Sequence, residues 1–432
     1  MLSPALLLLA ALPEAPAFCG TYVGGADDDI YNEVSGAAMV RTGTTTILTV
    51  ANDVLGEFEG FALLIPVPEV LDADDLKVLD PGVFDRLGLY SAPRLVSYDC
   101  SDFDAETDTD ADTDADTDSD TDVDVEGRYI VGEYDVAILS ASESSALGEW
   151  LRDNGYAVPA QTAPLLDAYI EAGAYFLAAR VAPEAGITPG TMLSPLQMRY
   201  ANPTFSLPIR IGTASSKGEQ DLILYTLTEP EDGATGVANY PQIEPVDECM
   251  WDEDGRGFSD FYADTFADAY AAAGDGAWAR EYAWAGGGCD PCPSPPPDAS
   301  DLFSLGVAEE RLDTGDFFFT RLHLRYTPEQ ADEDLVLYHS NLRGPEQLRY
   351  IQYNPLLEDR FPLCVGGWAD DPGSCVDPGG DSGAGDGGGS GDDGEKAAGC
   401  GCAAPGAALT APWLALGLAV ARRRRQAPGA RG

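Results

Sequence analysis

The sequence predicts an α+β protein, in which a mostly antiparallel β-sheet domain with a packed helical hairpin is followed by a smaller, cysteine-containing second part. Strand-like runs and segments of helical period both occur, and they do not alternate regularly as they would in a doubly wound sheet. The chain has 432 residues, more than one ordinary domain needs, and 44% of them are hydrophobic. We therefore expect two folded parts and several spacers.

The first predicted part, residues 18–240, begins with strands. Residues 38–50 and 61–67 are β-branched and apolar runs, and turn-forming residues lie between them at 52–56. We expect these two runs to pair as antiparallel strands. Another strand-like run covers 129–139.

Helical period replaces strand alternation after Ser144. One apolar face lies around 147–151 and a second around 165–170, and Gly173 ends the second helix. The pattern predicts a helical hairpin, from Ser144 to Gly173, that packs on the sheet. Further strands are expected at 175–181, 197–200, 221–227, 317–326 and 335–338, and a further helix at 261–273.

The second predicted part covers 241–369, and its start falls within an aperiodic stretch at 229–245 that could be a linker or a long loop. Residues 370–398 are rich in Asp, Gly and Ser and predict a flexible spacer.

Residues 101–126 are mostly Asp-Thr-Asp-Ala repeats, which cannot bury a core, so we expect a solvated, disordered insertion in the first part. These aspartates lack the glycine and distal glutamate of a calcium loop, so we expect at most weak calcium binding.

The composition is strongly acidic, with 74 acidic residues, 24 basic residues and a formal net charge of -50. This charge repels nucleic acid, so we expect no nucleic-acid partner.

Both chain ends predict export. Residues 1–17 resemble a signal peptide, because an apolar run at 2–12 is followed by the small-x-small cleavage pattern that ends at Ala17. The export machinery is then the first partner. One feature of ordinary signal peptides is missing, since no Lys or Arg precedes the apolar run.

The C-terminal tail predicts membrane attachment. Cys400 and Cys402 precede 19 mostly apolar residues, 403–421, which as a helix would span roughly 30 Å of hydrocarbon. A cluster of arginines follows and would stay in the cytoplasm: Arg422, Arg423, Arg424 and Arg425. This order of parts, over 399–426, resembles the MYXO-CTERM sorting tail of myxobacteria and their relatives. The resemblance implies sorting machinery as a partner, cleavage near the cysteines, a modified Cys400 or Cys402, and anchoring at the cell surface or outer membrane. A plain transmembrane anchor is the alternative.

Cysteines are the first candidate site residues. Seven lie before the tail, and in an exported chain we expect disulfides among them, with one that is free, intermolecular or a ligand: Cys19, Cys100, Cys249, Cys289, Cys292, Cys364 and Cys375. The spacing of Cys289 and Cys292 also fits a redox pair or half a zinc site. Glycines before the pair and prolines after it leave no helix N-terminus to lower a thiol pKa. We favour structural disulfides, and zinc and redox chemistry remain open.

Histidine gives the second candidate site. His323 stands in an alternating run with Arg321 and Arg325 on the same face, and two cations beside it predict a lowered pKa. No carboxylate that could orient the ring is identifiable from spacing, so a structural role is favoured over a catalytic one. No nucleophile elbow, zinc-protease motif or phosphate loop occurs. We expect no cofactor.

Several stretches, in this order, resemble the family called domain of unknown function 2330: Ala17-Phe18-Cys19-Gly20, Phe61-Ala62-Leu63-Leu64-Ile65-Pro66-Val67-Pro68, Trp150-Leu151-Arg152-Asp153-Asn154-Gly155-Tyr156-Ala157-Val158-Pro159, Glu281-Tyr282-Ala283-Trp284, Cys289-Asp290-Pro291-Cys292 and Thr320-Arg321-Leu322-His323-Leu324-Arg325-Tyr326. The resemblance runs from about Phe18 to Tyr353 and implies an exported bacterial domain with no assigned activity. It carries over no catalytic residue.

These observations favour an exported, surface-anchored binding or structural module of a bacterial envelope, with an unidentified extracellular or envelope ligand. The alternative is a secreted enzyme that uses Cys289 and Cys292, or His323.

Overall fold

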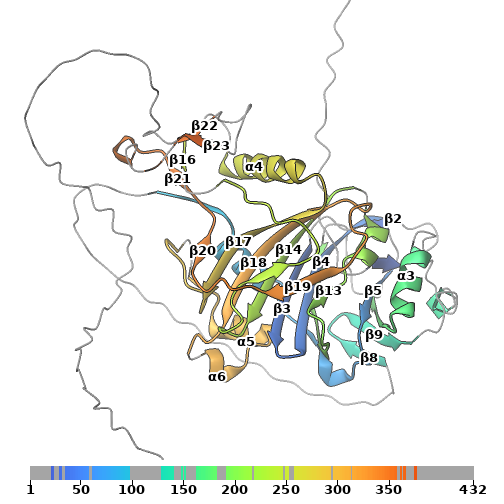
Figure 1. Cartoon of the computed structure of the whole chain (residues 1–432). Coiled ribbons are helices and arrows are strands. Elements are labelled where there is room, and N and C mark those ends of the chain that lie inside the picture. The colour runs from blue at the N-terminus through green and yellow to red at the C-terminus, as the bar shows by residue number, and fades with distance from the viewer. Residues whose placement is uncertain are drawn as a thin grey trace, which may run out of the picture.

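In the computed structural model, two β-sheets pack face to face and helices cover their outer faces (Figure 1). The structure describes residues 21–376 except 24–28, 32–34, 58–60, 98–127, 141–146, 149, 152–161, 182–190, 217, 247–248, 253–256, 293–294, 313, 358–360, 362 and 366–373. Several predicted features lie outside the described residues: the signal peptide, Cys19, Cys100, the acidic insertion, Cys400, Cys402, the predicted span 403–421, the four arginines and most of the spacer.

The largest sheet has ten strands in the order β20-β17-β18-β14-β3-β4-β12-β6, and β2 and β11 also pair with β4. Only the β14–β3 pairing within it is parallel. Its strands are β2 (Asp29–Tyr31), β3 (Ser35–Thr42), β4 (Thr45–Glu57), β6 (Leu76–Val78), β11 (Thr191–Met192), β12 (Leu196–Ala201), β14 (Gln220–Thr228), β17 (Ala277–Ala285), β18 (Phe318–Tyr326) and β20 (Glu346–Gln347). The mostly antiparallel sheet of the predicted α+β class is confirmed.

The second sheet has the order β1-β5-β10-β9-β8 and is antiparallel throughout. Its strands are β1 (Thr21–Val23), β5 (Phe61–Val67), β8 (Arg128–Val131), β9 (Tyr134–Leu139) and β10 (Tyr175–Val181). Phe61, Leu63 and Ile65 alternate along β5 and pack against the ten-stranded sheet, where they join the main core. Ala62 and Leu64 point the other way and are buried too, so β5 needs a layer on each face.

The predicted helical hairpin supplies that outer layer. Leu147 and Leu151 are helical, and α3 (Thr162–Glu171) carries Leu166 and Tyr169. These four side chains share one buried cluster with the outer face of β5 and β10. The packing of this segment on the sheet is therefore confirmed.

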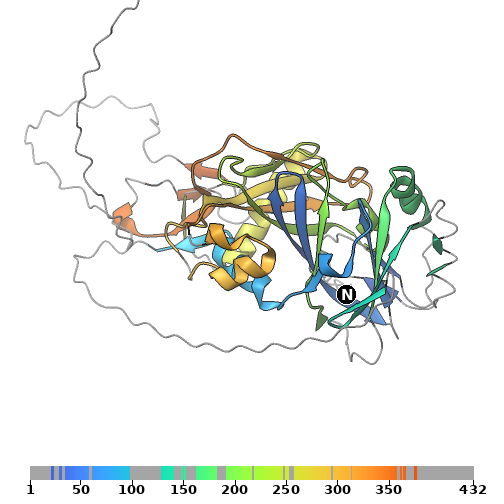
Figure 2. The ribbon, with the colours of Figure 1, turned by 90° about the horizontal axis from the view of Figure 1, so that it is seen from below.

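Three helices that the sequence did not predict cover one end of the free face of the ten-stranded sheet, and the predicted helix covers its other end. Figure 2 shows α1 (Gly82–Ser91) beside α5 (Ala299–Leu305) and the short α6 (Glu309–Leu312). Their apolar side chains form one cluster with β14, β17 and β18. The predicted helix is present as α4 (Phe258–Ala273) and covers the other end of this face.

Two smaller sheets complete the described fold. One is β13-β19-β15, made of β13 (Ser206–Leu207), β15 (Thr235–Val237) and β19 (Leu335–His339). The other is β23-β22-β16-β21-β7 beside α4, made of β7 (Arg94–Val96), β16 (Met250–Trp251), β21 (Arg349–Gln352), β22 (Leu363–Val365) and β23 (Ser374–Val376). Three 3₁₀ turns also occur, at η1 (Ala73–Asp75), η3 (Arg210–Ser215) and η4 (Pro355–Leu357). β23 lies inside the segment predicted as spacer.

The predicted pairing of residues 38–50 with 61–67 is wrong. Gly43, with φ of 56°, forms a tight turn, so β3 and β4 pair with each other instead. β4 then continues through 52–56, the predicted turn, and β5 lies in the second sheet. The run 129–139 is likewise two strands, because Gly132 with φ of 57° turns the chain between β8 and β9.

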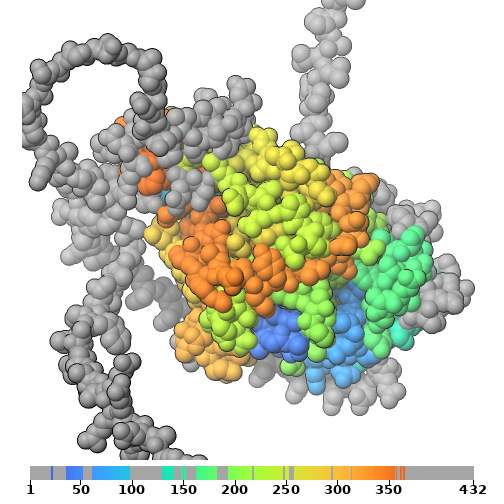
Figure 3. Space-filling model, in the orientation of Figure 1, coloured from blue at the N-terminus to red at the C-terminus, as the bar shows by residue number. Residues whose placement is uncertain are grey.

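Strands from both sides of residue 240 share the ten-stranded sheet. β17 and β18 come from the second predicted part, and β18 pairs along its length with β14 of the first. In Figure 3, surface from the N-terminal strands (blue) lies directly beside surface from the C-terminal half (orange). This shared sheet brings residues far apart in the chain into one cluster.

Candidate functional site

A row of charged side chains lies on the face of the ten-stranded sheet beneath α4. We call Asp221, Glu281, Arg321, His323 and Arg325 the charged row. Strand alternation places the last three on one face of β18, as the sequence predicts. Pairing with β14 sets Asp221 opposite Arg325.

A β-bulge brings Glu281 into the row. The register of β17 against β18 shifts between Arg280 and Tyr282, so Glu281 is an extra residue beside Arg321. Bulges of this kind re-aim a side chain and are common next to functional sites. Without the bulge, Glu281 and Tyr282 would point to opposite faces of the sheet.

Glu281 holds three partners although its side chain is fully buried, with 0% exposed. Its Oε2 accepts a hydrogen bond from Nε of Arg321 at 2.5 Å. Its Oε1 accepts one from the Tyr262 hydroxyl at 2.6 Å and lies 2.9 Å from Nδ1 of His323. A buried carboxylate needs such partners, because burial without them costs several kcal/mol.

Asp221 lies at the other end of the charged row, where it binds Arg325 and His323. Its two oxygens accept a bidentate pair from Arg325, at 2.8 Å from Nε and 2.7 Å from Nη2. The same Oδ1 lies 3.0 Å from Nε2 of His323. The imidazole of His323 therefore lies between two carboxylates, one at each ring nitrogen.

Helix α4 covers the charged row on the side that faces away from the sheet. Phe266 stacks on the His323 ring, with centroids 3.8 Å apart and planes at 15°. The guanidinium of Arg325 lies 5.1 Å from the Phe266 ring centre. As a result only 13% of the His323 side chain and 4% of the Arg325 side chain are exposed.

The predicted lowering of the His323 pKa is wrong. Burial alone would lower this pKa, but Glu281 and Asp221 outweigh burial and raise it to about 9. The sequence placed only Arg321 and Arg325 beside the ring, and the carboxylates come from neighbouring strands. In return, Arg321 and His323 hold the pKa of Glu281 at about 2 against the effect of its own burial.

This geometry sets what His323 can do. At neutral pH the ring is an imidazolium, and both N–H groups donate to carboxylates. Such a ring has no free lone pair with which to accept a proton, so it does not serve as a general base in this arrangement. The charged row acts as an ion network that ties β14, β17 and β18 together under α4.

We expect the free energy of unfolding to fall by about 3 kcal/mol between pH 6.5 and pH 9 because of His323. Its pKa is about 9 in the folded chain and near 6.5 when unfolded, so its stabilisation is complete below pH 6.5 and is lost as pH rises through 9. Urea unfolding at half-unit pH steps measures this decrease. The His323→Gln variant is the control and should lack the decrease. An equal decrease in the variant would contradict the assignment.

An open pocket of about 360 Å³ adjoins the Arg325 end of the row. Its lining combines carboxylates, Glu219 and Asp275, with the aromatic ring of Tyr270 and the amide of Gln330. Tyr270 donates a hydrogen bond to Gln330 Oε1 at 2.7 Å, which fixes the ring at the pocket wall. The pocket thus joins apolar surface to a few polar groups and is suited to a small ligand that carries hydrogen-bond donors.

Four of the described cysteines form two disulfides. Cys249 pairs with Cys364 across a sequence separation of 115, and Cys289 pairs with Cys292 across a separation of 3. The favoured disulfide interpretation is confirmed for these four residues. Cys375 lies opposite Cys364 in the β22–β23 register. Disulfides at Cys19, Cys100 and Cys375 remain predictions.

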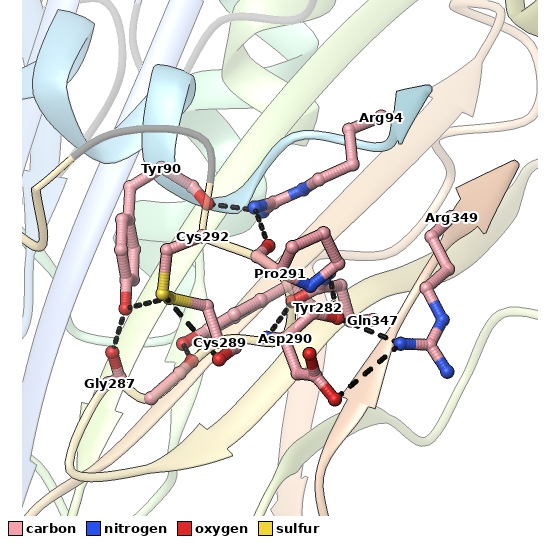
Figure 4. Close-up of a disulfide and its surroundings, with 11 residues drawn as sticks. Tyr90, Arg94, Tyr282, Gly287, Cys289, Asp290, Pro291, Cys292, Gln347 and Arg349 are labelled. Atoms are coloured by element: carbon pink, nitrogen blue, oxygen red, sulfur yellow. Dashed lines mark hydrogen bonds and ion pairs between the residues drawn. A yellow bond between two sulfur atoms is a disulfide. The ribbon is translucent and has the colours of Figure 1, made fainter. Parts of the chain in front are cut away.

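The Cys289–Cys292 loop lies between β17 and α5 and touches the C-terminal end of α1 (Figure 4). The Tyr90 hydroxyl contacts Cys289 Sγ at 2.9 Å and donates to the Gly287 carbonyl. Arg94 donates from Nη1 to the Pro291 carbonyl at 3.0 Å. As expected from the flanking glycines and prolines, no described helix begins at the pair.

Zinc binding was one alternative for these cysteines. Among the residues that the structure describes, no three or more His, Cys, Asp or Glu side chains are grouped to hold a metal ion.

Within the same residues, no helix is both long and apolar enough to span a membrane.

Sequence reasoning found His323, Arg321 and Arg325 but missed both carboxylates. Glu281 and Asp221 lie 42 and 102 residues from His323 in the chain, and only strand register brings them together. One signal was present: each is an acidic residue within a largely buried strand. Such a residue usually needs a buried cation as partner.

Comparison with protein families gives one clear result. The model of DUF2330, described as an uncharacterized protein conserved in bacteria, matches residues 13–338. The chain belongs to this family. The DUF2330 match includes the whole charged row, the pocket lining and both cysteines of the Cys289–Cys292 loop, and it ends before Cys364.

The other comparisons add little to the DUF2330 assignment. No curated protein matches the chain. Among solved structures, baculovirus P35 matches at 13% identity and a TM-score of 0.27, with 46% of this chain and 65% of that chain covered. The chain thus spans less than two thirds of P35, and a likeness at this TM-score supports no inference.

Proposed function

We propose that this DUF2330 protein is exported and held at the bacterial cell surface, where its folded part works as a binding or structural module of the envelope. The Cys249–Cys364 disulfide is the observation that carries the proposal. It joins segments 115 residues apart, and Cys249 is fully buried. Disulfides of this kind persist in oxidising compartments and are rare in the bacterial cytoplasm.

The two chain ends support the same location. Residues 1–17 have the pattern of a signal peptide, and residues 399–426 resemble a sorting tail that ends in an arginine cluster. The acidic insertion and the Gly- and Asp-rich spacer are of a kind that keeps a domain solvated and away from a membrane surface.

A binding role fits the described site better than hydrolysis by His323. Both ring nitrogens of His323 are occupied by carboxylates, whereas the pocket beside Tyr270 is open to solvent. The pocket is the place where we expect a small extracellular ligand with hydrogen-bond donors, such as an amine, to bind.

We expect the protein isolated from the bacterium that makes it to begin at Phe18 and to end near Cys400, with added lipid mass. Intact mass spectrometry measures both ends in one experiment. External protease should also remove the folded part from intact cells. A Cys400→Ser, Cys402→Ser variant is the control and should keep its arginine tail and lack the lipid.

Two outcomes would contradict this proposal. A full-length mass with residues 1–17 retained and resistance to external protease would place the protein inside the cell. Cleavage at Phe18 with an unmodified arginine tail would instead make it a transmembrane protein, and the surface anchor would be wrong.

A further inference from the structure

A buried cation, for which the described part of the chain provides no carboxylate partner, lies beside the Cys289–Cys292 loop. Arg94 is 8% exposed, and its Nε has no hydrogen-bond partner among the residues that the structure describes. Its other nitrogens donate only to backbone carbonyls, those of Tyr90 and Pro291. Burial lowers the pKa of Arg94 and outweighs the opposite effect of Tyr282 and Tyr90, while Arg321 lowers the pKa as well. A negative charge placed here would relieve this desolvation cost.

The other buried cations in this region are already compensated. Arg321 pairs with Glu281, Arg325 pairs with Asp221, and His323 contacts both carboxylates. None of these carboxylates bonds to Arg94. The oxidised Cys289–Cys292 pair is neutral, so it leaves Arg94 without an anion.

The two sulfurs differ in environment. Cys292 is exposed at the surface, whereas Cys289 is half-buried beneath Tyr90 (Figure 4). The Tyr90 hydroxyl lies 2.9 Å from Cys289 Sγ. Burial raises the pKa of Tyr90, so this hydroxyl keeps its proton, and it can turn from the Gly287 carbonyl to donate that proton to a sulfur anion.

We propose that Cys289–Cys292 is a thiol–disulfide exchange site that oxidises exposed dithiols of extracellular or envelope proteins. Reduction would create a thiolate at Cys289. The Tyr90 hydroxyl would contact this thiolate directly, and the charge of Arg94, which is bound to the Pro291 carbonyl of the same loop, would stabilise it without contact. Stabilising the reduced form makes a disulfide a stronger oxidant. A buried cation and a hydroxyl take the place of the helix N-terminus that this motif lacks.

The exchange has two balanced steps. A substrate thiolate attacks the exposed Cys292 Sγ, the Cys289–Cys292 bond breaks, and Cys289 leaves as the thiolate that Tyr90 and Arg94 stabilise. The second substrate thiol, as its thiolate, then attacks the substrate sulfur of the mixed disulfide and releases Cys292. The substrate loses two electrons and two protons in total and gains a disulfide, and the protein becomes a dithiol.

The disulfide of this loop can be reduced without unfolding the rest of the protein. Its disulfide closes a separation of only 3 residues, and the loop is also held by other contacts, such as Arg349 Nη1 to the Asp290 carbonyl at 2.8 Å. The activity goes beyond the binding role proposed above and does not depend on surface anchoring, so it can be tested separately on the purified chain.

The test is equilibration of the full-length protein in glutathione buffers of graded redox ratio. Differential alkylation and peptide mass spectrometry then report the reduced fraction of each cysteine pair. We expect Cys289–Cys292 to be half reduced at a glutathione redox ratio at least a hundredfold more oxidising than the ratio that half reduces Cys249–Cys364. We expect Arg94→Met to make the pair at least tenfold harder to reduce, a shift of about 30 mV.

Two further variants separate the mechanism from a folding defect. Tyr90→Phe keeps the ring and removes the hydroxyl, and it should make the pair severalfold harder to reduce. If Arg94→Met does not fold, the Tyr90→Phe variant alone carries the test. Arg349→Met is the matched control. It removes a β21 cation that contacts the same loop and lies 4.0 Å from the Asp290 carboxylate, so it should change the equilibrium less than twofold.

A substrate assay completes the test. The oxidised protein, mixed with a reduced two-cysteine peptide, should yield one peptide disulfide per molecule, and Cys289→Ser, Cys292→Ser protein should yield none. The proposal is overturned if Cys289–Cys292 is as hard to reduce as Cys249–Cys364. It is also overturned if both Tyr90→Phe and a folded Arg94→Met variant leave the equilibrium within twofold of the wild type.

Discussion

Glu281→Gln should lower the free energy of unfolding by about 4 kcal/mol, because breaking a buried ion pair by removing one partner leaves the other charge uncompensated. The substitution keeps the shape of the side chain and removes its charge. Arg321, 11% exposed, would then lack its ion pair, and His323 would keep only Asp221. Denaturant unfolding of the purified chain at pH 7, followed by circular dichroism, measures the loss.

Glu346→Gln is the matched control for this prediction. Glu346 pairs with Arg280 at 2.6 Å in the same sheet, but 35% of its side chain is exposed. Partly solvated pairs contribute little, so the control should lose less than about 1 kcal/mol. Equal losses in the two variants would mean that the charged row does not stabilise the fold as inferred.

The same residues show where sequence reasoning stopped. β10, β12, β14 and β18 were predicted because their apolar alternation or continuous apolar runs are written in local sequence. β17 was missed, since Ala277–Ala285 mixes small residues with Arg280 and Glu281 and the bulge breaks its alternation. α1 was missed as well, because glycines at both 82 and 88 weaken its helical pattern.

The candidate site depended on information that local patterns do not hold. Which face His323 occupies follows from alternation, and this part was predicted correctly. Which residues lie opposite it follows from strand order and register, which depend on the packing of the whole sheet. The pKa of His323 was therefore assigned the wrong sign, although its neighbours along β18 were right.

The cysteines illustrate the same limit in another way. Export and cysteine number together predicted disulfides, and the structure forms two among the described residues. The pairing could not be deduced, because connectivity depends on which segments meet in space. The buried Arg94, which binds the Pro291 carbonyl of the Cys289–Cys292 loop, was equally hidden, since it comes from β7, almost two hundred residues away in the chain.

Removing the long disulfide should have the largest effect on stability. We expect Cys249→Ala, Cys364→Ala to lower the free energy of unfolding by about 5 kcal/mol, because the bond closes a loop with a separation of 115 residues. Alanine is chosen because Cys249 lies in an apolar cluster with Trp251, Phe261 and Tyr350. Urea unfolding of the oxidised protein measures the loss.

The short disulfide provides the control within the same molecule. Cys289→Ala, Cys292→Ala opens a loop with a separation of only 3 residues, for which the same loop-entropy argument gives about 2 kcal/mol. A larger loss from the short pair than from the long one would reverse the roles assigned here. The long bond would then not be the structural tie between β16 and β22, and the short loop could not open for exchange without unfolding its surroundings.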